Sequence, residues 1–175
     1  MIRKKGEYMP IADESDAEAK KYVESFILRE ILKNEAIPEE LREKIRNKKA
    51  KILDIGTGKG LAVDFLLEEG YQACGIDYQN LNPEKTENKI IADAAQVPFA
   101  DNTFDIIMSI GGIDPVFYRD QTPEKMEEIE SEIKRILKDP GVFVSPSALK
   151  EMPTFGEADS IRILSKYVAL KTTKK

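Results

Sequence analysis

The sequence predicts an α/β fold in which a doubly wound, mostly parallel sheet is covered by helices. Two observations lead to this prediction. Short apolar segments alternate along the chain with amphipathic segments of helical periodicity, which is typical of successive βαβ units. Residues 104–110 are almost continuously apolar, as expected for a central parallel strand buried on both faces. Right-handed crossovers would then place a ligand beyond the carboxyl ends of the strands.

Length and composition bound the number of domains. The chain has 175 residues, of which 41% are hydrophobic and 34% are charged, and this suits one globular domain. We expect residues 1–49 to form an N-terminal helical cap and residues 50–146 to form the binding core. Residues 147–175 would form a shortened C-terminal strand region.

The charge balance and the rare residue types exclude several function classes. With 27 Lys and Arg against 32 Asp and Glu, the net charge is -5, so we expect no nucleic-acid partner. No apolar run approaches the roughly 20 residues of a membrane helix, so no membrane partner is expected. The single cysteine, Cys74, suits a reducing, cytoplasmic location. Histidine is absent, which removes the most common general base and metal ligand, and we expect no metal site.

The N-terminal half contains the predicted cap and the first strands. Apolar residues recur at helical spacing over residues 13–34, and Pro38 suits the first turn of a second, shorter helix. A strand at Lys51–Ile55 then leads through glycines into a helix at 61–69. Residues 71–76 and 89–92 predict the second and third strands.

The C-terminal half begins at the central strand, which two glycines follow. A helix is expected from Thr122, its N-cap, through Leu137, before the helix-breaking residues 139–141. A fifth strand is expected at residues 142–145. Residues 160–173 are rich enough in β-branched and aromatic residues for one or two more strands.

The glycine turn after the first strand is the first functional signal. Gly56, Gly58 and Gly60 lack side chains, so a ligand can approach the backbone, although such glycines can also simply form a tight turn. Asp77 favours the ligand, because it ends the next strand, where an acid can accept hydrogen bonds from both hydroxyls of a ribose. Taken alone, Asp77 could instead cap a turn. Together these residues indicate a nucleoside-containing ligand.

The spacing of the glycines separates nucleoside cofactors. Dinucleotide sites have the pattern G-x-G-x-x-G, whereas position 61 here is Leu61 and the pattern is G-x-G-x-G. Asp54, just before the first glycine, places a carboxylate where an ammonium group could pair with it and a pyrophosphate would be repelled. No P-loop pattern occurs in the chain.

Four ordered segments resemble class I methyltransferases of the ubiquinone/menaquinone-methylase type (type 11). They are residues 53–60 (LDIGTGKG), 75–77 (GID), 92–107 (ADAAQVPFADNTFDII) and 136–141 (ILKDPG). The resemblance covers roughly residues 50–146. It implies a Rossmann-like methyltransferase fold, S-adenosylmethionine as the cofactor, and in-line transfer of a methyl group to an acceptor.

The resemblance also implies roles for single residues. Asp77 would bind the ribose hydroxyls, the Asp93 carboxylate and the Ala94 amide would read the adenine edge, and the glycine loop would border the methionine part. The cofactor-binding residues implied in this way are Asp54, Gly56, Thr57, Gly58, Gly60, Asp77, Tyr78, Asp93, Ala94, Ser109 and Ile110.

The acceptor side carries weaker signals. If the acceptor must lose a proton, the candidate catalytic residues are Asp114, Tyr118 and Asp120 in the loop after the central strand, although each also fits an ordinary solvated loop. The family's amine-directed Asn-Pro-Pro-Tyr/Phe motif is not present. We therefore expect a small-molecule substrate, bound between this loop and the N-terminal helices.

Two alternatives stay open on the sequence. One is a non-catalytic S-adenosylmethionine-binding regulator or partner subunit, and the less favoured one is an NAD(P)-dependent oxidoreductase. The resemblance also implies a helix and an antiparallel hairpin after the fifth strand, for which the chain leaves little room. Since exposed sheet edges tend to be covered, we expect a second copy to protect this edge in a homodimer.

Overall fold

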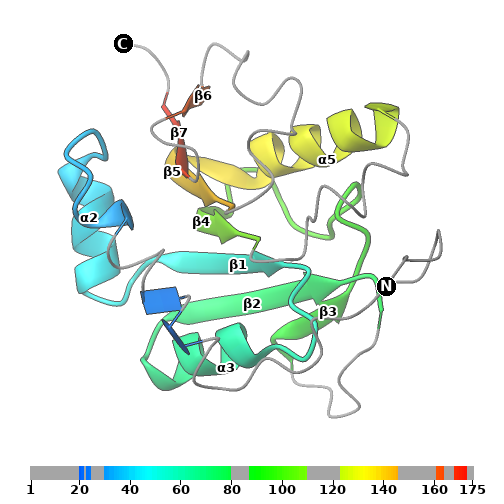
Figure 1. The fold of residues 1–175 in the computed structure, drawn as a ribbon, viewed down its shortest axis with the longest axis horizontal. Coiled ribbons are helices and arrows are strands. Elements are labelled where there is room, and N and C mark those ends of the chain that lie inside the picture. The colour runs from blue at the N-terminus through cyan, green and yellow to red at the C-terminus, as the bar shows by residue number, and fades with distance from the viewer. Residues whose placement is uncertain are drawn as a thin grey trace, which may run out of the picture.

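The computed structural model describes residues 20–21, 23–24, 30–79, 87–109, 123–145, 161–163 and 168–172. Its centre is a seven-stranded sheet of order β3-β2-β1-β4-β5-β7-β6 (Figure 1). The strands are β1 Lys51–Ile55, β2 Gln72–Asp77, β3 Lys89–Ile91, β4 Phe104–Met108, β5 Leu137–Val144, β6 Ile161–Ile163 and β7 Val168–Lys171. The helices described in full are α2 Glu39–Arg46, α3 Leu61–Glu68 and α5 Pro123–Ile136.

The register confirms the doubly wound, mostly parallel sheet. Strands β3, β2, β1, β4 and β5 are parallel neighbours, whereas β7 pairs antiparallel with both β5 and β6. Strand β4 lies in the middle, and all five of its residues are buried. A continuously apolar strand is needed there because both of its faces are covered.

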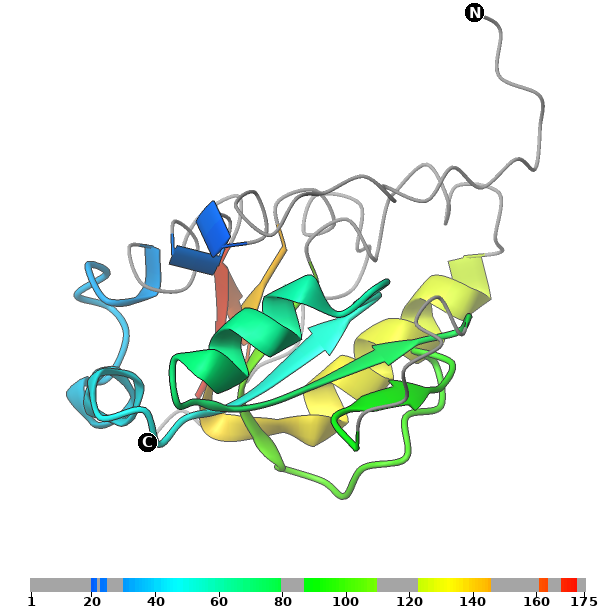
Figure 2. The same ribbon diagram turned by 90° about the horizontal axis from the view of Figure 1, so that it is seen from below.

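Helices cover the two faces of the sheet, with α3 on one side and α5 on the other (Figure 2). Alternate residues of the central strands contribute to two separate cores, as the two-residue period of a strand requires. The core under α5 contains Leu53, Ile107, Phe143, Ile129 and Ile133, and the core under α2 and α3 contains Ile52, Ile106, Val142, Val63 and Leu41. This packing holds the carboxyl ends of the neighbouring strands β1, β2 and β4 close together on one side of the molecule.

The junction between α5 and β5 differs from the prediction. The helix ends at Ile136, and Leu137 opens β5 instead of continuing the apolar face of the helix. The reason is tertiary: Leu137 is fully buried and pairs with Phe104 at the start of β4. An irregularity between Phe104 and Ile106 accommodates the longer strand, so residues 139–141 lie within β5.

The C-terminal strands confirm the prediction of one or two strands within residues 160–173. They form an antiparallel pair, β6 with β7, that extends the sheet beyond β5, so the expectation that the chain leaves little room for such a pair was wrong. The strands are only three and four residues long, and such short strands require few residues. The homodimer that an incomplete edge suggested stays a prediction.

Other boundaries shift by a few residues. Strand β4 ends at Met108, short of the predicted Ile110, which lies outside the described residues, and β3 ends at Ile91. Most of the helix predicted over residues 13–34 also lies outside them. None of the helices that the structure describes is long and apolar enough to span a membrane.

Candidate functional site

The glycine turn connects β1 to α3. Gly56, Gly58 and Gly60 have φ angles of 76°, 55° and 82°, in the left-handed region that favours glycine. A Cβ atom added at Gly58 would meet nothing within 4 Å. The backbone of the turn is therefore open to a ligand at its middle glycine.

Asp77 ends β2 and is fixed against this turn. Its side chain is buried, with a residue exposure of 7%. Its Oδ2 accepts a hydrogen bond from the Gly58 N–H at 2.9 Å, and its Oδ1 accepts one from the Gln79 N–H at 3.0 Å. Because a carboxylate oxygen has two lone pairs, each oxygen can accept one further hydrogen bond. Two adjacent hydroxyl groups, such as those of a ribose, match this arrangement.

The turn is also held to β2 through Thr57. The Gly56 and Thr57 N–H groups both donate to the Ile76 carbonyl, at 2.8 and 3.0 Å. The Thr57 side chain packs over Gly75, where a Cβ atom would lie 2.5 Å from Thr57 Oγ1. That hydroxyl is buried and has no hydrogen-bond partner among the described residues. A buried hydroxyl without a partner is costly, so a polar ligand group here would be favourable.

Asp54 and Ser109 lie at the carboxyl ends of the neighbouring strands β1 and β4. Asp54 is 5% exposed and pairs in register with Met108, the residue before Ser109. Ser109 is fully buried, and its hydroxyl donates to the Ile55 carbonyl at 3.0 Å. The carboxyl ends of these strands therefore present the buried carboxylate of Asp54, which can pair with a ligand ammonium group.

Asp93 and Tyr78 are the exposed members of the predicted set. Asp93 follows β3, and its carboxylate accepts hydrogen bonds from the Ala95 N–H at 2.9 Å and from Lys125 Nζ at 2.8 Å. The Lys125 ammonium group, followed by the Ala95 amide, lowers the pKa of Asp93. Tyr78, directly after Asp77, is 47% exposed. Ala94, by contrast, is buried in the core under α5.

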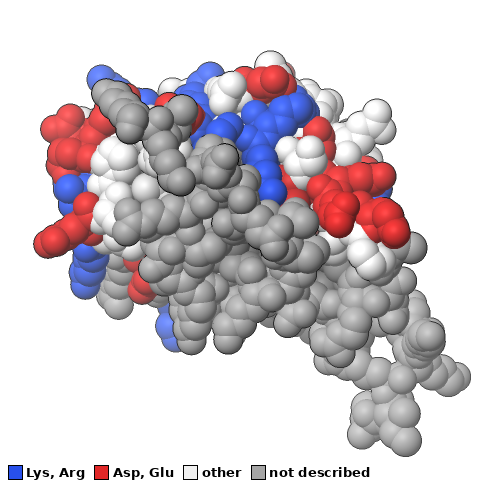
Figure 3. Space-filling model, turned by 90° about the horizontal axis from the view of Figure 1, so that it is seen from above, with Lys and Arg blue, Asp and Glu red and all other residues white. Residues whose placement is uncertain are grey.

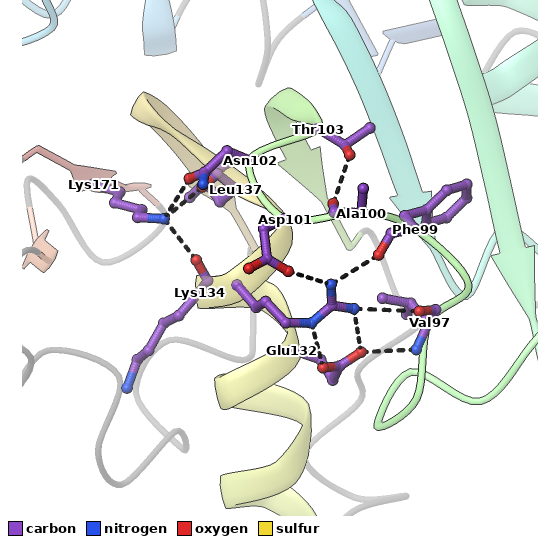
Figure 4. A network of polar contacts seen from close by, with 11 residues as sticks. Val97, Phe99, Ala100, Asp101, Asn102, Thr103, Glu132, Lys134, Leu137 and Lys171 are labelled. Carbon is purple, nitrogen blue, oxygen red and sulfur yellow. Dashed lines mark hydrogen bonds and ion pairs between the residues drawn. The ribbon is translucent and has the colours of Figure 1, made fainter.

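A polar network ties the segment between β3 and β4 to α5 (Figure 4). Arg135, in the last turn of α5, donates from Nη1 to the Phe99 carbonyl and to Asp101, both at 2.8 Å. Glu132 accepts from Arg135 Nε at 2.7 Å and from the Val97 N–H at 2.9 Å. This network positions the segment that begins with Asp93.

Sequence reasoning missed Arg135, Glu132 and Lys125. The only local signal was the spacing of Glu132 and Arg135, which suits an ion pair within a helix. Their partners between β3 and β4 lie about 30 or more positions away in the sequence and cannot be read from periodicity.

The structure thus brings Asp54, the glycine turn, Asp77 and Ser109 together at the carboxyl ends of the parallel strands. Asp93 follows β3, the strand at the edge of the sheet. Four predicted residues lie outside the described part of the chain: Ile110, Asp114, Tyr118 and Asp120. Within the described part, no group of three or more Cys, Asp and Glu side chains is placed to hold a metal ion.

Comparisons with known proteins agree with this architecture. A family model described as a methyltransferase domain matches residues 53–145. An 18S rRNA (guanine-N(7))-methyltransferase from Bos taurus is 36% identical over 74 residues, which cover 38% of this chain and 26% of that protein. The chain therefore spans about a quarter of the length of that curated relative.

Two solved structures share the fold. A protein from Pyrococcus horikoshii has a TM-score of 0.50 and 22% identity, over 90% of this chain and 77% of its own. A protein from Methanococcus maripaludis, proposed to be an S-adenosyl-L-methionine-dependent methyltransferase, has a TM-score of 0.50 and 18% identity, over 100% of this chain and 98% of its own.

Proposed function

This chain belongs to the methyltransferase-domain family, and we propose that it is an S-adenosylmethionine-dependent methyltransferase that acts on a small-molecule acceptor. One observation carries the proposal. The buried Asp77 carboxylate at the end of β2 is fixed by the Gly58 N–H beside an open glycine turn. The cofactor supplies a methyl group on a sulfonium, from which transfer leaves a neutral thioether.

The hydrogen-bond donors and acceptors of the site complement those of the cofactor. Asp77 would accept hydrogen bonds from the two ribose hydroxyls, and the buried Asp54 would pair with the ammonium group of the methionine part. The Thr57 hydroxyl, which has no partner among the residues that the structure describes, would donate to, or accept from, the same part of the ligand. Asp93 would accept from the exocyclic amine of adenine.

Positioning and exclusion of water would supply most of the rate acceleration. Methyl transfer is an in-line displacement, so holding the donor and the acceptor in line lowers the barrier without a proton transfer. The chain has no histidine, which agrees with a reaction that needs no strong general base. If the acceptor must lose a proton, Asp114, Tyr118 and Asp120 stay the predicted candidates.

The charge distribution favours a small acceptor over a polyanion such as rRNA. On the face shown in Figure 3, basic side chains lie beside acidic ones. Three basic residues near the end of α5 pair with carboxylates: Lys134 with Glu130, Arg135 with Asp101, and Lys138 with Asp105. With a net charge of -5 as well, little positive potential is available to attract phosphates.

Binding and transfer experiments test the proposal separately. Calorimetric titration should show binding of S-adenosylmethionine and S-adenosylhomocysteine and none of NAD. Transfer of a tritiated methyl group should label a component of a small-metabolite extract and not total RNA. Absence of S-adenosylhomocysteine binding would overturn the cofactor assignment. Binding without transfer to either extract would favour the non-catalytic alternative, and labelling of RNA would overturn the small-molecule acceptor.

A further inference from the structure

The carboxylate of Asp93 is held from two sides by elements that are distant in sequence. Oδ1 accepts the Ala95 N–H at 2.9 Å, while Oδ2 accepts Lys125 Nζ at 2.8 Å from the first turn of α5. The Asp93 carbonyl also accepts the Gln96 N–H at 2.9 Å, which closes the turn after β3. The carboxylate is therefore fixed in one orientation relative to the backbone that carries it.

This contact leaves room for a ligand. The side chains of Lys125 and Asp93 are 30% and 54% exposed, so solvent or a ligand can reach the pair. Each carboxylate oxygen has a second lone pair that can accept a further donor. The Lys125 ammonium group also lies 3.5 Å from Glu128, a carboxylate on the same helix.

We propose that Lys125 is a positioning residue that orients the Asp93 carboxylate to select a 6-aminopurine, adenine, against its 6-oxo counterpart. This inference rests on the proposed function, because it deepens the recognition of the adenine part of the cofactor. An ionised carboxylate can only accept hydrogen bonds. It therefore favours the exocyclic amine, which donates, and opposes a 6-oxo group, which presents a second acceptor.

Lys125 contributes orientation. The hydrogen bond from its ammonium group is the largest of the effects that lower the pKa of Asp93, which agrees with a direct contact between the two charged groups. Without Lys125, the Ala95 N–H would be the remaining described donor to this side chain, and Oδ2 could turn toward solvent. The selectivity for an amine should then fall, while the turn itself, closed by backbone hydrogen bonds, persists.

The test compares S-adenosylhomocysteine with S-inosylhomocysteine, its 6-oxo analogue, by calorimetric titration. The wild-type protein should prefer the 6-amino ligand. Lys125→Met should weaken S-adenosylhomocysteine binding by about fivefold, as expected for a partly exposed ion pair, and should not weaken binding of the 6-oxo ligand. Lys125→Arg should restore the preference, because arginine also donates to a carboxylate.

Glu128→Gln is the matched control, since it removes the other acidic neighbour of Lys125 and leaves the contact with Asp93 intact. This variant should keep the wild-type preference. If Lys125→Met proves unstable in thermal unfolding, Lys125→Ala removes the same ammonium donor with the residue of highest helix propensity.

The outcomes separate this inference from the proposed function. A wild-type protein that binds neither ligand overturns the proposed function itself. A wild-type protein that binds both ligands equally, or a Lys125→Met variant that keeps the full preference, overturns the role of Lys125 and leaves the proposed function standing.

Discussion

The backbone N–H of Gly58 donates a hydrogen bond to Oδ2 of Asp77 over 2.9 Å, which joins the glycine turn after β1 to the end of β2. The carboxylate that we propose to bind the ribose thus also holds the glycine turn that we propose to border the methionine part of the cofactor. Ligand affinity and local stability are therefore coupled at Asp77.

Substitution of Asp77 should separate these two effects. Asp77→Ala leaves the Gly58 and Gln79 N–H groups without their acceptor, which should cost about 1–3 kcal/mol of unfolding free energy. Asp77→Asn keeps one oxygen acceptor and should cost less. Both variants should bind S-adenosylhomocysteine at least roughly tenfold more weakly, because charge-assisted hydrogen bonds to the ribose are lost. Calorimetry and urea denaturation measure the two effects, and unchanged affinity in both variants would remove Asp77 from the site.

Gly60 and Gly70 form a matched pair for testing the packing around α3. Both have positive φ angles, 82° and 86°, so alanine at either position should cost roughly 1–2 kcal/mol. A Cβ atom at Gly70 would meet nothing within 4 Å, whereas one at Gly60 would overlap the side chain of Lys89. That side chain is held by Asp64 at 2.7 Å.

Gly60→Ala should therefore lower the unfolding free energy by up to about 1 kcal/mol more than Gly70→Ala does, because the end of the Lys89 side chain must move and weaken its pair with the half-exposed Asp64. Urea denaturation of the two variants measures the difference. A smaller loss for Gly60→Ala than for Gly70→Ala would contradict the overlap with Lys89.

Asp105 should contribute to stability against acid. It is 1% exposed and accepts hydrogen bonds from Lys138 Nζ at 2.8 Å and from the Lys51 N–H at 2.9 Å. Burial by itself would raise the pKa of Asp105, but these hydrogen bonds outweigh it and the pKa lies below its usual value. The folded protein therefore binds this proton less readily than the unfolded chain does.

The stabilisation from Asp105 should be fully present above about pH 4 and should disappear as the pH falls through the lowered pKa. Asp105→Asn should reduce the unfolding free energy at pH 7 and make its decline below about pH 4 shallower. Urea denaturation across this range measures the slope. Glu69→Gln, which removes the charge from the more exposed pair with Lys48, is the control. If the slope for Asp105→Asn is the same as that of the wild-type protein, the lowered pKa of Asp105 is contradicted.

Cys74 should be chemically inert in the folded protein. Burial, followed by the negative charge of Asp54, raises the pKa of its thiol to about 11. Since the thiolate is the reactive form, iodoacetamide at pH 8 should alkylate the folded protein at least about tenfold more slowly than the chain unfolded in urea. Mass spectrometry follows the reaction, and equal rates would show that Cys74 is accessible and ionised.

The sequence by itself determined the α/β architecture of the core and the place of the glycine turn and Asp77 in the candidate site. The positions of the first five strands along the chain follow from local periodicity, and so does the central place of the strand that begins at Phe104. Gly56, Gly58 and Asp77 mark strand ends in a parallel sheet, where side chains from successive strands meet. These features could be predicted because each depends on residues that are close in the chain.

Only the tertiary structure decided where Leu137 lies and which groups hold Asp93. Leu137 has the helical spacing of α5, but pairing with Phe104 and complete burial place it in β5. Lys125 contacts Asp93 only because α5 packs across the sheet toward the end of β3. Such contacts depend on how separate elements cross, and neither periodicity nor a motif encodes that crossing.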